Sequence, residues 1–168
     1  MSWRGVLALR RNEFGHPVAM QPLKLIALDE EDLAVVSSHL QDAVVRVGDM
    51  VYQPSKKRFA AVLNRFDWES AQGGNGKDFK RRRTALRFER VFGAKLRHVR
   101  PSAEERVLSL LAVRFEPDDA PAGRVILTFS GDASIQLQVE CIEAELKDLG
   151  PAWSTRSKPE HPGTEPGS

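Results

Sequence analysis

Apolar and polar residues follow clear periods from Met20 onward, and the first such stretch predicts a strand and then a helix. Residues 23–28 are mostly apolar, which is typical of a short buried strand. Asp29 is a good N-cap, and three acidic residues follow it in the first turn, where the helix dipole favours negative charge. The helix should run to about Asp42 and pack against a sheet through one apolar stripe. That stripe consists of Leu33, Val36, Leu40 and Ala43.

From Val44 the period changes to two, which indicates extended chain. We expect short strands at residues 44–47 and 50–53, followed by a polar turn at residues 54–57. Residues 58–68 form a longer segment with apolar side chains on both faces. This pattern predicts a central strand, or one bent between two packed layers.

The stretch at residues 77–100 predicts two strands joined near Gly93. Even-numbered positions should face the core, and these are Thr84, Leu86, Phe88 and Phe92. Odd-numbered charged residues should face outward, and these are Arg81, Arg83, Arg87 and Glu89, with Lys95 and Arg97 continuing beyond Gly93. Arginines two residues apart on one face lie about 7 Å from each other. A polyanion could follow such a row.

The last third of the sequence predicts a strand, a hairpin and a second helix. Val107, Ser109, Leu111, Val113 and Phe115 should be the inward residues of the strand. Residues 124–139 are a hairpin that turns at Gly131 and Asp132. Its inward residues are Val125, Leu127, Phe129, Ile135, Leu137 and Val139. Ile142, Leu146 and Leu149 then have helical spacing, and Gly150 with Pro151 ends that helix.

This order of elements predicts an α+β fold with a mainly antiparallel sheet or roll of about seven to eight strands, because the connections are too short for helical crossovers. One helix lies N-terminal and one C-terminal. Strands that end in an amphipathic helix are comparable in architecture to a pleckstrin-homology-like roll. We expect one globular domain at residues 20–153 and a disordered tail at 154–168. Residues 1–19 are either a disordered leader or a misassigned start before Met20.

Composition excludes several classes of protein. The hydrophobic fraction of 41% and the charged fraction of 29% are ordinary for a soluble domain. The single cysteine, Cys141, excludes an internal disulfide and favours the cytoplasm. No apolar run approaches the roughly 20 residues of a membrane-spanning helix. We therefore expect no membrane association.

Charge is unevenly distributed along the chain. Residues 77–100 carry ten basic and two acidic residues, which gives +8. Residues 1–76 carry nine of each, and residues 101–168 carry six basic and twelve acidic residues, so the three blocks sum to +2. One interpretation is that the acidic end neutralises the basic stretch, within the chain or in a homo-oligomer. The acidic residues available for this are Glu140, Glu143, Glu145 and Asp148. The alternatives are a solvated face and a polyanion-binding face.

No known chemical motif is complete. The loop QGGNGK has Ala71 and Asp78 where a phosphate-binding loop needs glycine and a hydroxyl residue. His39 and His98 lack neighbours at ligand spacing, so no metal or cofactor is expected. Cys141 continues the inward positions of the hairpin and is interpreted as a core residue. The carboxylates that a polar cleft could use are Asp49, Asp67 and Glu69.

Three segments together resemble one known family. They are LKLIALDEEDLAVVSSHLQDAVVRV, the Gly48-Asp49 pair after it, and RFAAVLNRFDW at residues 58–68. In this order they resemble an uncharacterised alphaproteobacterial family, domain of unknown function 2948, over residues 23–150. The resemblance implies a small bacterial cytosolic protein, and it implies no catalytic residues.

The sequence favours a non-enzymatic binding or protein-interaction module with an unidentified protein partner. The first alternative is a weak, sequence-indifferent nucleic-acid binder that acts through Arg81, Arg83, Arg87, Lys95 and Arg97. The second is an enzyme whose site matches no known motif.

Overall fold

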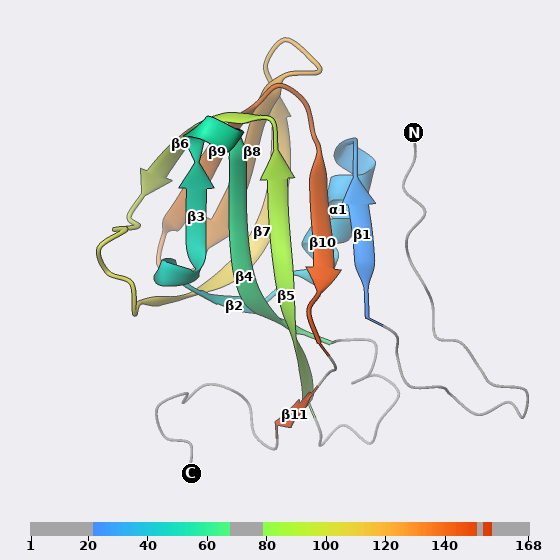
Figure 1. Ribbon diagram of the computed structural model, residues 1–168, viewed down its shortest axis with the longest axis vertical. Helices are drawn as coiled ribbons and strands as arrows, with labels where there is room; N and C mark the ends of the chain where they lie inside the picture. Colours follow the sequence, from blue (N-terminus) through green and yellow to red (C-terminus); the bar gives the residue numbers. More distant parts are fainter. Residues whose placement is uncertain (1–21, 68–78, 151–152, 156–168) are drawn as a thin grey trace, which may run out of the picture.

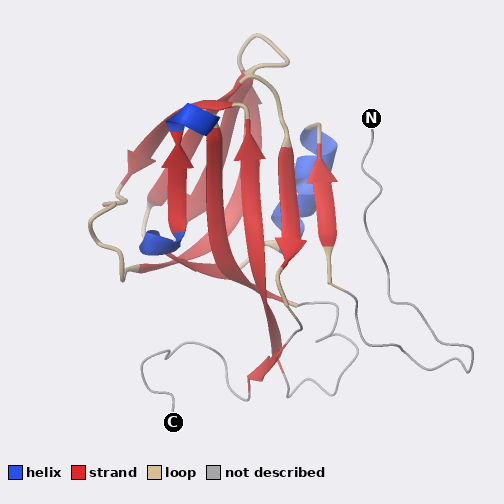
Figure 2. Ribbon diagram, in the orientation of Figure 1, coloured by secondary structure: helices blue, strands red, loops and turns tan. Residues whose placement is uncertain are grey.

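In the computed structural model, the described residues are 22–67, 79–150 and 153–155, and they form one antiparallel sheet of eleven strands with one α-helix (Figures 1 and 2). The elements are β1 Lys24–Ala27, α1 Glu30–His39, β2 Ala43–Arg46, η1 Val47–Asp49, β3 Met50–Gln53, η2 Pro54–Lys56, β4 Arg58–Phe66, β5 Phe79–Glu89, β6 Val91–Arg97, β7 Val107–Pro117, β8 Gly123–Phe129, β9 Ala133–Val139, β10 Ala144–Asp148 and β11 Trp153–Thr155. The predicted leader, the QGGNGK loop, Glu69 and most of the predicted tail lie outside the described residues. None of the described helices is long and apolar enough to cross a membrane.

The sheet follows an open path, β1-β10-β5-β4-β2-β7-β8-β9-β6, with β3 added beside β4 and β11 beside β5. Figure 1 shows β3, β4, β5 and β10 in front of β7, β8 and β9, so the sheet bends into two layers. Buried side chains from both layers form a single core cluster, which includes Leu86 and Phe88 in front and Leu127 and Leu137 behind. The predicted antiparallel architecture is confirmed, and the sheet is larger than expected.

Helix α1 forms where the sequence predicts it. The Asp29 side chain accepts a hydrogen bond from the Asp32 amide at 2.8 Å, which is the expected N-cap. Leu33 and Val36 are buried, and the helix packs against β1 and β7. The helix ends at His39 rather than near Asp42, because Asp42 has a φ of 66° and turns the chain into β2.

The predicted C-terminal helix is wrong, because its residues form strand β10. Ile142, Leu146 and Leu149 fit helical spacing, yet Ile142, Ala144 and Leu146 also alternate with a period of two, and this second period decides the structure. The next inward position is Asp148, a charged residue that hides the strand pattern. The pleckstrin-homology-like analogy depended on that helix and loses its basis.

The inward face of β7 was assigned correctly only in its second half. Leu108 and Leu110 are buried, whereas Val107 and Leu111 are exposed. A bulge between Leu110 and Ala112 shifts the register against β8, and Val113 is buried after it. A bulge changes side-chain parity without a sequence signal. The following hairpin of β8 and β9 has the predicted inward residues.

The basic stretch divides into two strands with different neighbours. Thr84, Leu86 and Phe88 of β5 are buried as predicted, but Phe92 is 54% exposed. The chain turns at Arg90, whose φ is 61°, and Val91 takes the buried position instead. Strand β5 pairs with β4 and β10, while β6 pairs with β9. The two halves of the stretch therefore lie apart in the sheet order.

Candidate binding groove on the outer face of the sheet

Neighbouring residues of β5 point to opposite faces of the sheet. Thr84 and Leu86 point into the core, so odd-numbered residues such as Arg81 and Arg83 lie on the outer face. The pairing register places Phe66 opposite Arg81 and Asn64 opposite Arg83. Directly paired residues share a face, so these side chains form one outer row on β4 and β5.

A groove lies across this outer row. Val44 of β2 pairs with Asn64 on one side and with Ser109 of β7 on the other, which continues the row over four strands. The groove encloses about 610 Å³, within the range of about 300–1,000 Å³ that is usual for ligand sites. Its lining residues are Val44, Arg46, Asp49, Val62, Leu63, Asn64, Arg81, Arg83, Val107 and Ser109.

Arg81 is the deepest cation of the groove, with only 7% of its surface exposed. Its Nη1 donates to the backbone oxygen of Asn64 at 3.3 Å, and its guanidinium carbon lies 5.4 Å from the centre of the Phe66 ring. Its Nε has no hydrogen-bond partner among the residues that the structure describes. Within residues 22–67 and 79–150, no carboxylate forms an ion pair with it. Burial lowers the pKa of Arg81, and the charge of Asp42 offsets part of that shift.

The polar groups around Arg81 differ in whether they have hydrogen-bond or ion-pair partners in the described structure. The buried Oδ1 of Asn64 accepts no hydrogen bond. Arg83 is exposed and forms no ion pair with any residue in the described part of the chain. Arg46, in contrast, lies 3.2 Å from Asp49 and 3.1 Å from Glu105. Arg81 and Arg83 are therefore the cations of the groove that contact no carboxylate in the described structure.

The remaining surface of the groove is apolar. Val44 and Val62 contribute aliphatic side chains from β2 and β4. Val107 adds an exposed side chain from β7. A ligand in this groove would meet aliphatic groups beside two guanidinium groups.

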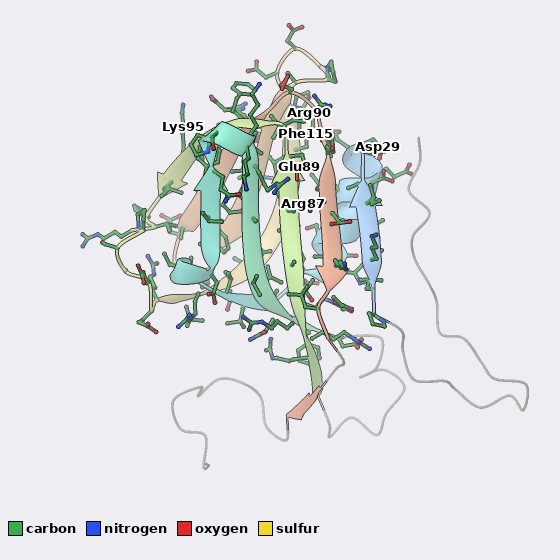
Figure 3. The ribbon with its side chains drawn as sticks, in the orientation of Figure 1. Asp29, Arg87, Glu89, Arg90, Lys95 and Phe115 are labelled. Atoms are coloured by element: carbon green, nitrogen blue, oxygen red, sulfur yellow. The ribbon has the colours of Figure 1, made fainter. Side chains whose placement is uncertain are left out.

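The five predicted polyanion-binding residues do not form one continuous surface. Arg81 is buried in the groove, and Arg83 lies at its rim. Arg87 contacts Glu89 at 2.9 Å and Glu145 at 3.0 Å. Lys95 and Arg97 lie on β6, which does not pair with β5; Figure 3 shows Lys95 well away from Arg87. The expectation that Arg81 is an exposed member of a row is wrong, because the chain buries it beside Phe66.

The interpretation that acidic residues near the end of the chain neutralise the basic stretch is confirmed for several pairs. Arg90 contacts Glu143 at 3.2 Å, and Arg87 contacts Glu145. Arg87, Arg90 and Glu143 line a second pocket of about 360 Å³ together with Glu89, and the labelled Arg87, Glu89 and Arg90 lie close together in Figure 3. Opposite charges already meet there, so this pocket offers less unpaired charge than the groove. The carboxylates stand on or before strand β10, not on a helix.

A buried cluster of charged and polar side chains lies on the core side of β4, β5 and β10. This cluster is not among the features predicted from the sequence. Its members are Arg65, Asp67, Arg82, Thr84 and Asp148. Arg65 binds both carboxylate oxygens of Asp148 at 3.0 Å, and Arg82 binds Asp67 at 2.9 Å. Thr84 Oγ1 and the Leu23 amide each donate to Asp148 at 2.8 Å. Burial alone would raise the pKa of Asp148, but these hydrogen bonds and the charge of Arg65 hold it below its usual range.

A signal for this cluster exists in the sequence. Arg65 continues the inward positions of Phe59, Ala61 and Leu63, and Arg82 precedes Thr84 at an inward position. Charged residues of both signs at inward positions indicate internal ion pairs, since an unpaired buried charge is very unfavourable. The sequence indicates Asp67 only as a carboxylate that a polar cleft could use.

The candidate histidines and the cysteine lie in separate parts of the fold. No cluster of three or more metal-ligating side chains exists among the residues that the structure describes. Burial and the charge of Arg65 lower the pKa of His39. His98 Nδ1 lies 2.9 Å from the backbone oxygen of Asp132. Cys141 is only half-buried, contrary to its interpretation as a core residue, because Ile142 takes the buried position.

Comparison with known proteins gives one match. A family model described as "Protein of unknown function (DUF2948)" matches residues 23–161. No curated protein and no solved structure matches the chain. The groove therefore has to be interpreted from its own chemistry.

Proposed function

The chain belongs to the DUF2948 family, and we propose that it is a non-enzymatic binding module whose outer groove receives an acidic, partly apolar segment of a partner protein. One observation carries this proposal. The groove combines aliphatic residues with two arginines that have no carboxylate partner within the described ranges. Such a surface complements a segment that carries both carboxylates and apolar side chains.

Charge complementarity favours an anionic partner over a neutral one. Arg83 attracts anions from solution because it is exposed and unpaired in the described structure. Val44, Val62 and Val107 supply apolar contact area, which gives affinity beyond electrostatic attraction. A protein segment fits this combination better than a nucleic-acid backbone, which has no aliphatic side chains. A cytoplasmic setting accords with the single cysteine.

Fluorescence anisotropy tests the proposal with a labelled peptide of alternating Glu and Val residues. The full chain should bind it saturably. Arg83→Gln should weaken binding about tenfold, which corresponds to about 1.4 kcal/mol. Lys95→Gln is the matched control, since Lys95 is an exposed cation on β6 outside the groove, and it should leave affinity unchanged. Absence of binding, or equal weakening by both substitutions, would overturn the proposal.

Polyanion binding through the basic stretch is the second candidate, because Arg83, Lys95 and Arg97 are all exposed. A gel-shift series with single-stranded DNA tests it at about 50 mM salt and above. Under this function, Lys95→Gln and Arg83→Gln should both weaken DNA binding and flatten its salt dependence. A full chain that gives no shift at low salt would exclude this function.

A further inference from the structure

We infer that Arg81 is the specificity-determining anchor of the groove and binds one carboxylate of the acidic segment in a desolvated subsite beneath Arg83. This inference rests on the proposed function and names the group that recognises the ligand. It assigns different roles to the two arginines. Arg83 attracts the acidic segment from solution. Arg81 distinguishes a segment with a carboxylate at this position from one without it.

Burial of a charged side chain that contacts no opposite charge lowers the stability of the protein. Arg65 and Arg82 are equally buried, and each meets a carboxylate inside the protein. Arg81 has no such partner in the described structure and is held only by a long hydrogen bond and the Phe66 ring. A desolvated guanidinium that lacks a counter-charge is destabilising. Residues kept despite such a cost are typical of binding sites.

Two buried polar atoms beside the groove have no hydrogen-bond partner among the described residues. Nη1 of Arg81 is engaged by Asn64, whereas Nε has no partner. Nε is buried, so a carboxylate reaches it by displacing the atoms that cover it, and it can then form two parallel hydrogen bonds along that edge of the guanidinium. The unpaired Oδ1 of Asn64 needs a donor. A peptide offers both groups, a side-chain carboxylate and a backbone N–H, while a phosphodiester offers no N–H.

Arg81 is buried, whereas Arg83 is exposed to solvent. Salt screens interactions between exposed charges strongly and those between buried charges much less. The contribution of Arg83 should therefore disappear in concentrated salt. The contribution of Arg81 should persist, because its contact is removed from solvent.

The experiment compares Arg81→Met with Arg83→Gln in the full chain, using the same Glu-Val peptide at about 0.1 M and about 1 M salt, where the Debye length falls from about 10 Å to about 3 Å. Arg81→Met should weaken binding about tenfold at both salt concentrations. Arg83→Gln should weaken it only at the lower one. At about 1 M salt, where the contribution of Arg83 is screened, a peptide with Gln in place of every Glu should lose the same binding as Arg81→Met.

Thermal unfolding distinguishes an anchor from a structural residue. Methionine fills similar space without a charge, so Arg81→Met should leave the melting temperature unchanged or raise it. A lowered melting temperature together with intact peptide binding would show that Arg81 is structural and would overturn the inference, while the proposed function would stand. If the unsubstituted chain does not bind the peptide, the proposed function itself fails.

Discussion

Arg81 and Arg82 are adjacent in β5 and both buried, with 7% and 3% of their surface exposed, yet their electrostatic surroundings differ. Arg82 faces the core and meets Asp67 at 2.9 Å and Asp148 at 3.7 Å. Arg81 faces the groove and meets no carboxylate in the described structure. Burial is therefore not what distinguishes them. The difference lies in whether a carboxylate of the protein contacts the guanidinium, since Asp42 acts on Arg81 as a nearby charge without an ion pair.

This comparison indicates how the sheet separates two roles on its two faces. Ion pairs on the core side join β4, β5 and β10, and they are complete without any ligand. The outer face leaves a hydrogen-bond donor at Arg81 and an acceptor at Asn64 unused. The core side should therefore respond to substitution in stability, and the outer side in binding.

The largest effect should come from Asp148→Ala. This substitution leaves Arg65 buried without its carboxylate and removes the acceptor of the Leu23 amide. We expect the free energy of unfolding, measured by urea denaturation, to fall by about 3–5 kcal/mol. Glu145→Ala on the same strand is the control and should cost less than about 1 kcal/mol, because its ion pairs are near the surface. Equal losses would contradict a special role for the buried cluster.

A comparison of Arg82→Gln with Arg83→Gln contrasts the two faces of one strand. Arg82→Gln deprives Asp67 of its guanidinium and should lower the free energy of unfolding by about 3 kcal/mol. Arg83→Gln alters an exposed side chain and should change it by less than about 0.5 kcal/mol. Guanidinium chloride denaturation at neutral pH measures both. A larger loss for Arg83→Gln would refute the assignment of faces.

Thr84→Val should have a smaller effect of about 1–2 kcal/mol. Its hydroxyl donates to Asp148 at 2.8 Å, and valine keeps the shape while removing that donor. Thr128→Val on β8 is the matched control, because Thr128 lies at a half-exposed outward position. It should shift the free energy of unfolding by less than about 0.5 kcal/mol. Similar losses at both sites, measured by urea denaturation, would mean that the Thr84 hydroxyl does not matter.

The smallest effect should be a shallow pH dependence caused by His39. Burial, with the charge of Arg65, lowers the pKa of His39 below its ordinary value of 6.5, although Asp148 and Asp67 oppose the shift. Near pH 6 the unfolded chain therefore binds more protons than the folded one, so stability should decrease as the pH falls from about 7 to about 5.5. Urea midpoints at both values measure this slope, and His39→Gln should flatten it. A slope that survives the substitution would have another origin.

Much of the fold follows from hydrophobic periodicity. The β8–β9 hairpin was predicted correctly because Val125, Leu127, Ile135 and Leu137 alternate without interruption. Helix α1 was predicted correctly because its cap and its apolar stripe agree. Strand β10 was mistaken for a helix because Asp148 stands where an apolar residue would have shown the period of two.

The groove was only partly visible in the sequence. Arg81 and Arg83 were singled out by their charge and parity, but nothing in the sequence showed that Arg81 is buried. That depends on the register of β4, which places Phe66 opposite it. Val44 and Ser109 join the groove through pairing between β2 and β7, and such long-range pairing leaves no local signal.

The hydrogen bond between Leu23 and Asp148 also constrains how the protein is made. These residues are 125 positions apart, and β10 is the strand beside which β1 lies in the sheet. During translation, β1 cannot pair with β10 until almost all of the domain has left the ribosome. Folding should therefore finish slowly and late, and chains that stop before Ala144 should expose Leu25 and be prone to aggregation.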